Sequence, residues 1–273
     1  MNVNKGKVYL VGAGPGDPEL LTVKALRLLH TAEVVLHDDL VTPEILKLIS
    51  PHAEVQNVGK RCGSKTIRQE EINFLLVTRA ASGLQVVRLK SGDPLIFGRA
   101  GEEIQALRRS NIEYEIIPGI TAALGAAAAA AIPLTHRQTS STLVLTAGHR
   151  ANQDDDLDWS RAASSESTLV VYMPGSNCGE IAGRLKAAGF TQETPCAIVS
   201  RATTPRQQLH VTTIADLHRS PKLSSPTLLV VGEVVRFAGR DLTASLPARE
   251  HETEAAFSQR VAEASNPEAE PWA

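Results

Sequence analysis

The segment Arg88–Glu103, RLKSGDPLIFGRAGEE, concentrates residues whose types and spacing suit binding and catalysis. An apolar run at 85–89 predicts a buried strand at its start, and Ser91 to Pro94 cannot continue that strand. Apolar residues at helical spacing then predict a helix over 101–109. The segment therefore spans the carboxyl end of a strand and the start of a helix, which is where open α/β sheets bind ligands.

Four residues of this loop have an evident chemical use. Gly92 and Gly98 let the main chain approach a ligand closely, because a glycine has no Cβ. Asp93 can accept hydrogen bonds from sugar hydroxyls, and Arg99 offers a planar fork that matches a carboxylate. The alternative is an ordinary turn that carries a solvated arginine, and both interpretations fit the loop taken alone.

Two other glycine-containing segments resemble nucleotide-binding motifs but depart from them. GAGPGD at Gly12–Asp17 follows a predicted strand, yet an aspartate takes the place of the third glycine of a dinucleotide fingerprint. In GKRCGSKT at Gly59–Thr66, Ser64 takes the place of the glycine before the lysine of a phosphate loop. We therefore expect neither a nicotinamide-binding fold nor a phosphate loop. The second segment contributes to a basic patch, which either faces an anionic substrate or is a solvated loop: Lys60, Arg61, Lys65 and Arg68.

Length and composition limit the classes of protein. A chain of 273 residues forms one large α/β domain or two of ordinary size. The 28 basic and 30 acidic residues nearly balance, so we expect no nucleic-acid partner and no membrane-surface role. Cys62, Cys178 and Cys196 lie far apart and form no CxxC pair, which favours a reducing compartment and disfavours a structural zinc site. The start of the chain is not leader-like and no apolar run is long enough to cross a membrane, so we expect a cytoplasmic protein.

Short apolar runs alternate with amphipathic ones along the chain, which predicts an α/β fold with a largely parallel sheet covered on both faces. In the first half we expect strands at 7–11, 34–37, 54–58, 85–89, 114–117 and 142–147. The helices expected there are 20–32, 43–49 with Thr42 as its cap, 69–81, 101–109 and 120–131. In the second half we expect strands at 168–173, 197–200, 208–212 and 227–231, and helices at 181–188 and 214–219.

The predicted domains follow from breaks in this alternation. We expect an amino-terminal α/β domain at 1–147 and a carboxyl-terminal α/β domain at 168–244. The polar, acidic stretch between them, at 148–167, is expected to be a linker or boundary segment. The tail at 245–273 is rich in Glu, Ala, Ser and Pro and is expected to be disordered.

Several segments occur in a fixed order along the first half of the chain: VYLVGAGPGDPELLT at 8–22, LHDDLVTPEIL at 36–46, VGKR at 58–61, the central segment at 88–103, IPGITAA at 117–123 and IPLTHR at 132–137. The series continues in the second half with LVVYM, SRATTPRQ and SPTLLVVGEVV. Together these segments resemble the tetrapyrrole methylase family. The resemblance implies a kidney-shaped pair of α/β domains, usually a homodimer, with S-adenosylmethionine held in the cleft between them.

The resemblance implies an S-adenosylmethionine-dependent C-methyltransferase that needs no metal. The expected reaction methylates uroporphyrinogen III at C-2 and C-7 and gives precorrin-2 and S-adenosylhomocysteine, as in siroheme or cobalamin biosynthesis. The sulfonium methyl is already activated. The enzyme therefore has to hold the carbon nucleophile and the methyl in line, exclude water and manage the proton lost from the macrocycle.

The resemblance also assigns roles to individual residues. Asp38 matches the family's proposed proton acceptor, Lys60 its proposed donor, and Arg99 a further candidate for assisting deprotonation. Because an arginine is almost never neutral in a protein, we prefer Asp38 as the acceptor, with Arg99 as its electrostatic partner. Arg99, Lys60 and Arg137 suit the carboxylates of the substrate. Glu102 lies one helical turn from Arg99, where it can orient the guanidinium. The implied cofactor-binding residues are Pro15, Ser91, Gly92, Asp93, Ile96, Thr121, Ala122, Met173 and Ala202.

Four positions depart from the family's usual residues: His37, Ser91, Leu95 and Ala100. His37 stands where a tyrosine is common and is expected to pack or hydrogen-bond rather than to catalyse. The Cβ of Ser91 can narrow the approach to the cofactor, which affects affinity more than activity. Two rival functions remain open, namely methylation of a later corrin precursor and S-adenosylmethionine binding without turnover.

Overall fold

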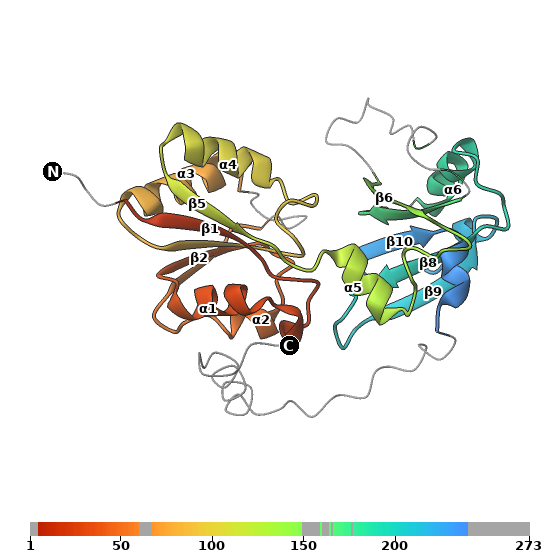
Figure 1. The fold of residues 1–273 in the computed structure, drawn as a ribbon, viewed down its shortest axis with the longest axis horizontal. Helices are drawn as coiled ribbons and strands as arrows, with labels where there is room; N and C mark the ends of the chain where they lie inside the picture. The colour runs from red at the N-terminus through yellow and green to blue at the C-terminus, as the bar shows by residue number, and fades with distance from the viewer. Residues whose placement is uncertain are drawn as a thin grey trace, which may run out of the picture.

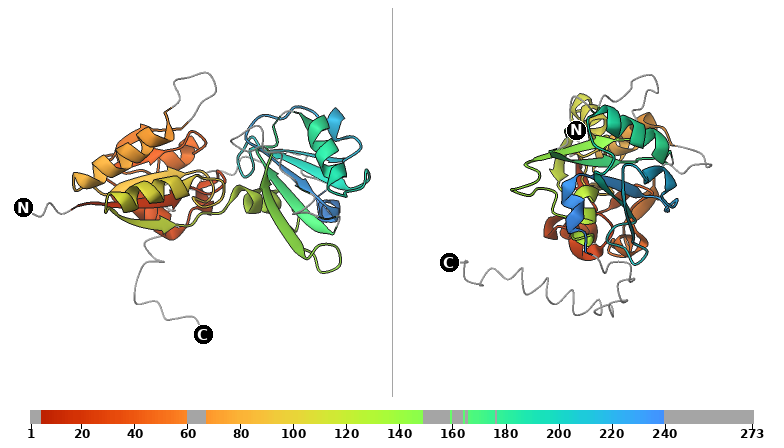
Figure 2. Two further views of the ribbon diagram at one scale, coloured as in Figure 1. Left: turned by 90° about the horizontal axis from the view of Figure 1, so that it is seen from above. Right: turned by 90° about the vertical axis from the view of Figure 1, so that its right-hand side faces the viewer.

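The computed structural model contains two α/β domains, each built on a five-stranded sheet (Figure 1). It describes residues 5–59, 67–148, 159, 164, 166–175 and 177–239. Figure 2 shows the two sheets one after the other along the molecule, joined through the segment that carries helix α5 (Ala122–Ala129). The two-domain α/β architecture predicted from the sequence is confirmed.

The first sheet is parallel throughout and has the order β3-β2-β4-β1-β5. Its strands are β1 (Lys7–Gly12), β2 (Val34–His37), β3 (Glu54–Asn57), β4 (Val86–Lys90) and β5 (Glu113–Ile117). The connecting elements are η1 (Pro18–Leu20), α1 (Val23–Thr31), α2 (Pro43–Leu46), α3 (Gln69–Ala81) and α4 (Ala100–Arg109). All residues of β4 are buried, because β2 and β1 flank it and helices cover both of its faces. The loop after β4 therefore emerges from the middle of the sheet.

Both faces of this sheet are covered, as the alternation of strands and helices predicts. On one face, Leu76 of α3 and Leu107 of α4 share a buried cluster with Leu10. On the other face, Leu29 of α1 shares a buried cluster with Val11. Leu10 and Val11 are adjacent in β1 and contribute to different clusters, because successive side chains of a strand point to opposite faces. Figure 1 shows α1 and α2 on one side of the sheet and α3 and α4 on the other.

The second sheet is mixed and has the order β6-β7-β10-β8-β9. Its strands are β6 (Thr142–Ala147), β7 (Ser167–Tyr172), β8 (Pro195–Ser200), β9 (Gln208–Thr213) and β10 (Thr227–Val231). β6 and β7 are parallel, whereas β10 runs antiparallel to both of its neighbours and β9 antiparallel to β8. One face carries α5 and η4 (Glu233–Phe237), and the other carries α6 (Cys178–Ala187) and η3 (Leu217–Arg219).

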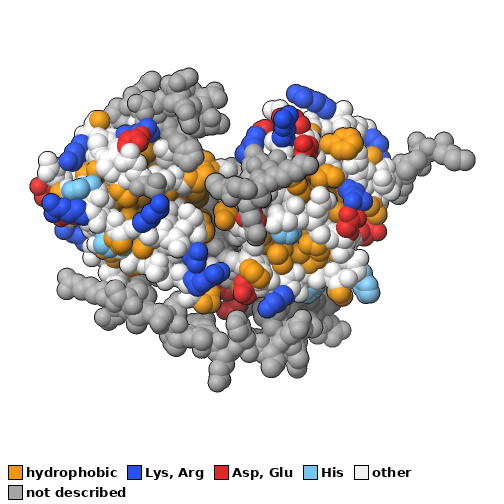
Figure 3. Space-filling view, turned by 180° about the vertical axis from the view of Figure 1, so that it is seen from behind, with side chains coloured by type: hydrophobic (Ala, Val, Ile, Leu, Met, Phe, Trp, Pro, Cys, Tyr) orange, Lys and Arg blue, Asp and Glu red, His pale blue; other side chains and the backbone are white. Residues whose placement is uncertain are grey.

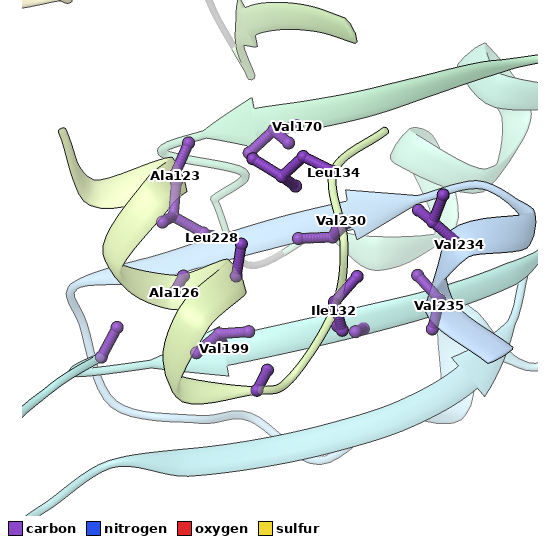
Figure 4. Close-up of a cluster of buried hydrophobic side chains, with 14 of the residues drawn as sticks. Ala123, Ala126, Ile132, Leu134, Val170, Val199, Leu228, Val230, Val234 and Val235 are labelled. Carbon is purple, nitrogen blue, oxygen red and sulfur yellow. The ribbon is translucent and has the colours of Figure 1, made fainter. Parts of the chain in front are cut away.

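Helix α5 packs on the second sheet, which corrects the predicted domain boundary. Ala123 and Ala126 of α5 lie over Val199 and Leu228 of the sheet in the cluster of Figure 4. Strand β6, expected to end the first domain, pairs with β7. The first sheet therefore ends with β5 and the second begins with β6, rather than after residue 147. The sequence did not reveal this, because an apolar strand pattern does not tell which sheet the strand joins.

The predicted linker at 148–167 contains a core residue. Trp159 is 3% exposed and packs in the second domain's cluster with α6. At this residue the segment is therefore part of the domain and not a spacer. Most of the remaining predicted linker, and all of the predicted disordered tail at 245–273, lies outside the described residues.

Two local expectations also differ. The helix expected at 214–219 is only the short 3-10 turn η3 (Leu217–Arg219). It ends at Arg219 because Pro221 disfavours a helical conformation of the preceding residue, Ser220. Thr42 stands at the N-cap of α2 as expected, but its hydroxyl donates to the Gly16 carbonyl at 2.9 Å rather than accepting from α2.

Three further observations concern the described residues alone. None of their helices is long and apolar enough to cross a membrane. They contain no group of three or more His, Cys, Asp or Glu side chains placed to hold a metal ion. Cys178 is partly buried and Cys196 is buried, and both are free thiols.

Candidate functional site

The loops after β1 and β4 meet at the carboxyl end of the first sheet, because their strands are neighbours. The loop after β1, at Gly12–Asp17, is called the first glycine loop below. The Gly14 amide donates to the Gly92 carbonyl at 3.1 Å, and the Gly92 amide donates to the Gly14 carbonyl at 2.8 Å. Both glycines have positive φ, 71° and 68°, which a residue with a Cβ adopts only at a cost. Pro15 follows directly, so it lies beside the loop after β4.

The loop before α5 closes against these two by backbone contact. An added Cβ on Gly119 would overlap the Gly92 carbonyl oxygen, and one on Gly12 would lie 2.6 Å from Gly119 Cα. One carboxylate oxygen of Asp93 accepts from the Leu95 amide at 2.8 Å, and the other accepts from the Gly119 amide at 3.0 Å. Asp93 therefore ties two loops together, and each of its oxygens keeps a lone pair for a ligand hydroxyl.

The second domain reaches this region through Tyr172, the last residue of β7. Its hydroxyl lies 2.6 Å from Thr121 Oγ1 and accepts from the Ala123 amide at 3.0 Å, which satisfies part of the first turn of α5. Burial raises the pKa of the Tyr172 hydroxyl, so the phenol keeps its proton and can donate it to Thr121. The ring of Tyr172 packs on Phe97 of the loop after β4, with centroids 4.7 Å apart. Met173 follows Tyr172 and is exposed, with φ of 50°.

These contacts gather the cofactor-binding residues that the resemblance implied. Ile96 and Ala122 pack against the buried cluster that includes Ala202. A Cβ added to Gly125 of α5 would lie 2.6 Å from the ring of Pro15. The remaining members lie on the loops already described: Ser91, Gly92, Asp93, Thr121 and Met173. Figure 3 shows a hollow between the two lobes of the molecule. The set combines mostly small side chains with turned backbone from both domains, and this composition suits a nucleoside-type cofactor.

A buried charge cluster that was not predicted from the sequence lies beneath the loop after β4. Arg88 and Lys90 are two residues apart on β4, so both point to the side of α4, where Glu103 is fully buried. The Glu103 carboxylate accepts from Arg88 Nε at 2.9 Å and from Lys90 Nζ at 3.0 and 3.1 Å. Arg88 also pairs with Asp38, and Gln69 donates to Glu103 at 3.3 Å. Two positive and two negative charges thus balance, as a buried cluster requires.

The basic members of this cluster differ in how firmly they hold their protons. Desolvation acts to lower the pKa of Arg88, but the negative charges of Asp38 and Glu103 outweigh it, and the pKa is raised. For Lys90, desolvation and then the nearby charge of Arg88 prevail, and the pKa is lowered. Lys90 is therefore the basic group of the cluster that releases its proton first.

The structure corrects the expected partner of Asp38. Its carboxylate pairs with the buried Arg88 and not with Arg99. The same guanidinium donates to the Leu36 and Leu89 carbonyls at 3.2 Å each, so it is fixed from several sides. The side chain of Asp38 is 29% exposed. The carboxylate is therefore held by a buried cation and still reaches solvent at the end of β2.

Arg99 stands at the start of α4 and pairs with Glu102. Its Nε and Nη2 donate to the two oxygens of Glu102 at 2.7 and 2.8 Å, and this contact raises the pKa of Arg99. The sequence predicted this contact, because the two residues are one helical turn apart. Arg99 has φ of 57° and its side chain is 45% exposed, so the remaining N–H groups are open to a ligand.

The other residues singled out in the sequence have less defined surroundings. Lys60 lies outside the described residues. Arg137 is exposed in the turn closed by the bridge between His136 and Ser140, on the way into the second sheet. His37 is buried and its Nδ1 lies 2.9 Å from the Asp38 carbonyl oxygen, in agreement with a packing and hydrogen-bonding role.

The buried charge cluster left a signal in the sequence. Arg88 and Lys90 sit in a strand whose central position requires burial on both faces, so each needed a buried acidic partner. Glu103 occurs at the helical spacing of Ala100 and Leu107, which both face the core. An acidic residue on the inward face of α4 could therefore have been predicted as their partner.

Comparison with known proteins agrees with this geometry. A family model described as Tetrapyrrole (Corrin/Porphyrin) Methylases matches residues 7–218. The chain belongs to the tetrapyrrole methylase family. The match runs from β1 into η3, so it covers the first domain, the loops of the site and the second domain as far as residue 218. The chain is accordingly an S-adenosylmethionine-dependent methyltransferase that acts on tetrapyrroles.

Curated relatives at nearly half identity are siroheme synthases. "Siroheme synthase 1" of Yersinia enterocolitica is 48% identical over 238 residues, which is 86% of this chain and 50% of the relative. "Siroheme synthase" of Azotobacter vinelandii is 49% identical over 234 residues, which is 85% of this chain and 50% of the relative. The chain therefore spans about half the length of the curated relatives it matches.

Solved structures share the two-domain tetrapyrrole methylase fold. Uroporphyrin-III C-methyl transferase from Thermus thermophilus, complexed with S-adenyl homocysteine, has a TM-score of 0.75 and 40% identity, covering 85% of this chain and 99% of that chain. Cobalt precorrin-4 methyltransferase also has a TM-score of 0.75, with 31% identity, covering 84% of this chain and 95% of that chain.

Proposed function

We propose that this chain methylates uroporphyrinogen III at C-2 and C-7, giving precorrin-2 and S-adenosylhomocysteine. The observation that carries the proposal is the likeness to a uroporphyrin-III C-methyl transferase, at 40% identity over 99% of that chain. The siroheme synthases at 48% and 49% identity support it, because siroheme formation needs precorrin-2. These relatives favour siroheme as the destination of the product.

Bound S-adenosylmethionine supplies an activated methyl group. The chain's own part is to bind and orient that cofactor, through Pro15, Ser91, Gly92, Asp93, Ile96, Thr121, Ala122, Met173 and Ala202. Main-chain amides and carbonyls are the main polar groups of this set, because most of its side chains are small or apolar. Ile96 and Ala122 contribute apolar surface that continues into the second domain's core and excludes water. Holding cofactor and macrocycle in fixed positions supplies much of the rate enhancement for such a displacement.

The substrate is held by cations that match its carboxylates. Arg99, Arg137 and Lys60 take this role, and Glu102 orients Arg99. The guanidinium of Arg99 spends two of its five N–H groups on Glu102, so three remain for a substrate carboxylate. Arginine suits this task because its planar fork binds a carboxylate through two hydrogen bonds.

Asp38 accepts the proton lost from the macrocycle, and Lys60 is the proton donor. Arg88 pairs with the Asp38 carboxylate, so it fixes the direction of the acceptor oxygens. Arg99, whose charge is shared with Glu102, stabilises negative charge on the substrate.

A second candidate function is methylation of a later corrin precursor. The likeness to cobalt precorrin-4 methyltransferase favours it, since the TM-score is the same, but the identity is lower at 31%. A third is cofactor binding without turnover.

We also propose that the chain acts as a homodimer, on the resemblance to the family.

Release of S-adenosylhomocysteine distinguishes these functions. The protein is incubated anaerobically with S-adenosylmethionine and either uroporphyrinogen III or a precorrin methylated at both C-2 and C-7. We expect S-adenosylhomocysteine to be released with uroporphyrinogen III and not with the methylated precorrin. Release with the precorrin alone would support the second candidate function. Tight binding of the cofactor with release from neither substrate would support binding without turnover.

A further inference from the structure

The turn Arg201–Gln207, between β8 and β9, leaves the second sheet and contacts the first glycine loop of the other domain. The Asp17 amide donates to Thr203 Oγ1 at 3.2 Å. A Cβ added to Gly16 would lie 2.8 Å from Thr204 Cγ2, and the φ of Gly16 is 145°, so this position favours a glycine. The turn is thus a point of direct contact between the two domains.

The first glycine loop is also held from its own domain. The Thr42 hydroxyl donates to the Gly16 carbonyl at 2.9 Å. The Asp17 carboxylate accepts from the Glu19 amide at 2.9 Å, where it caps η1. With Thr203 as a further partner, the loop is held by hydroxyl groups from both domains, directly after Pro15.

Thr203 is held in an unfavourable backbone conformation. Its φ is 64°, a region that glycine and asparagine tolerate and that a β-branched residue avoids. The Thr203 amide donates to Gln207 Oε1 at 2.7 Å, and Gln207 Nε2 donates to the Ala129 carbonyl at 3.3 Å. Strain of this kind persists only where surrounding contacts fix the residue. A glycine would remove the strain, but it would also remove the hydroxyl that accepts from Asp17.

We propose that Thr203 is a positioning residue that clasps the first glycine loop to the second domain and thereby sets the shape of the cofactor site. It stands next to Ala202, and its partner Asp17 stands two residues from Pro15, so the clasp connects cofactor-binding residues of both domains. The inference rests on the proposed cofactor site. It adds that the site is assembled by a cross-domain hydrogen bond to a strained threonine.

Three substitutions at this position separate the hydroxyl from the strain. Thr203→Val keeps the shape of the side chain and removes the hydroxyl. Thr203→Gly removes the hydroxyl and the strain together, and Thr203→Ser keeps the hydroxyl. The control is Asn111→Gly, which also places a glycine at positive φ, 51°, but at the exposed end of α4.

Hydrogen exchange of the Asp17 amide in the whole chain measures the clasp itself. We expect exchange to be faster in Thr203→Val and Thr203→Gly than in the wild type, and close to the wild type in Thr203→Ser and Asn111→Gly. Unchanged exchange in both hydroxyl-free variants would overturn the clasp.

Calorimetric titration with S-adenosylhomocysteine measures the consequence for the cofactor site. Loss of one neutral hydrogen bond should weaken binding about two- to ten-fold in Thr203→Val and Thr203→Gly. The unfolding midpoint of Thr203→Gly should be no lower than that of Thr203→Val, because the strain is gone, and Thr203→Ser should bind within about twofold of the wild type. Faster exchange with unchanged affinity would overturn the positioning role. A wild-type chain that binds no S-adenosylhomocysteine, yet shows the exchange effect, would sink the proposed cofactor site and leave the clasp standing.

Discussion

Replacing Glu103 by glutamine tests the buried charge cluster. Glu103 is fully buried and accepts from Arg88 at 2.9 Å and from Lys90 at 3.0 and 3.1 Å. The substitution removes one of two negative charges and leaves Asp38 to balance two cations in the interior. Removing one partner of a buried ion pair costs about 3 to 5 kcal/mol. We therefore expect the unfolding midpoint of the first domain to fall by roughly 10 to 20 °C at neutral pH.

The loss should shrink as the pH rises. Desolvation already lowers the pKa of Lys90, so the folded protein binds fewer protons at this group than the unfolded chain, whose value is near 10.5. The free energy of unfolding therefore rises with pH between the lowered pKa of Lys90 in the folded protein and 10.5. In Glu103→Gln, loss of the proton from Lys90 leaves one positive charge on Arg88 and one negative charge on Asp38, so the remaining charges balance. Adding Lys90→Met should recover part of the lost stability at neutral pH by the same balance.

Thermal unfolding followed by circular dichroism from about pH 6 to pH 10 measures both effects. The matched control is Glu113→Gln, which breaks the 2.9 Å pair with Lys7 at a glutamate that is 72% exposed. A surface pair of this kind contributes about 0 to 1 kcal/mol, so the control should lose no more than a few degrees. A midpoint for Glu103→Gln close to that of the control, or a deficit that grows with pH, would refute the reasoning.

Three further predictions concern the proposed function. Arg99→Lys should keep S-adenosylhomocysteine binding but lose much of its turnover, and Arg99→Ala should lose roughly thirty-fold to a thousand-fold, as expected for a charge-assisted contact worth on the order of 2 to 4 kcal/mol. Near-normal turnover of Arg99→Ala, measured with the unfolding midpoint and the cofactor affinity, would exclude its substrate role. S-adenosylhomocysteine should bind and inhibit, since it lacks only the methyl group, and calorimetry that detects no binding would count against the cofactor site. The chain should be a dimer by light scattering at micromolar concentration, and a monomer there would contradict the homodimer.

Much of the fold could be predicted because its signals are local. Helix α3 at 69–81 and strands β2 and β10 have the predicted bounds, since apolar periodicity and flanking turn residues define them. The parallel first sheet followed from the regular alternation of strands and helices. Membership of β6 in the second sheet could not be predicted, because strand pairing depends on residues far away in the chain. The burial of Trp159 could not be predicted either, because this residue lies in a polar stretch that offers no local apolar pattern.

The candidate site divides in the same way. The loop after β4 and the contact between Arg99 and Glu102 followed from sequence spacing alone. The partner of Asp38 did not, because Arg88 is 50 residues away and reaches it only through the pairing of β2 with β4. Tyr172 and Thr203 were also missed, since each acts on residues of another element or domain. Such contacts require the three-dimensional arrangement, whereas loop chemistry can be read from the chain.

Anaerobic incubation with uroporphyrinogen III and S-adenosylmethionine that carries a labelled methyl group tests the central claim most directly. The mass of the tetrapyrrole is read at intervals. The account predicts that one labelled methyl group is gained first and a second later, with one S-adenosylhomocysteine released for each. A tetrapyrrole that gains no label, in a preparation shown by calorimetry to bind S-adenosylhomocysteine, would contradict the claim.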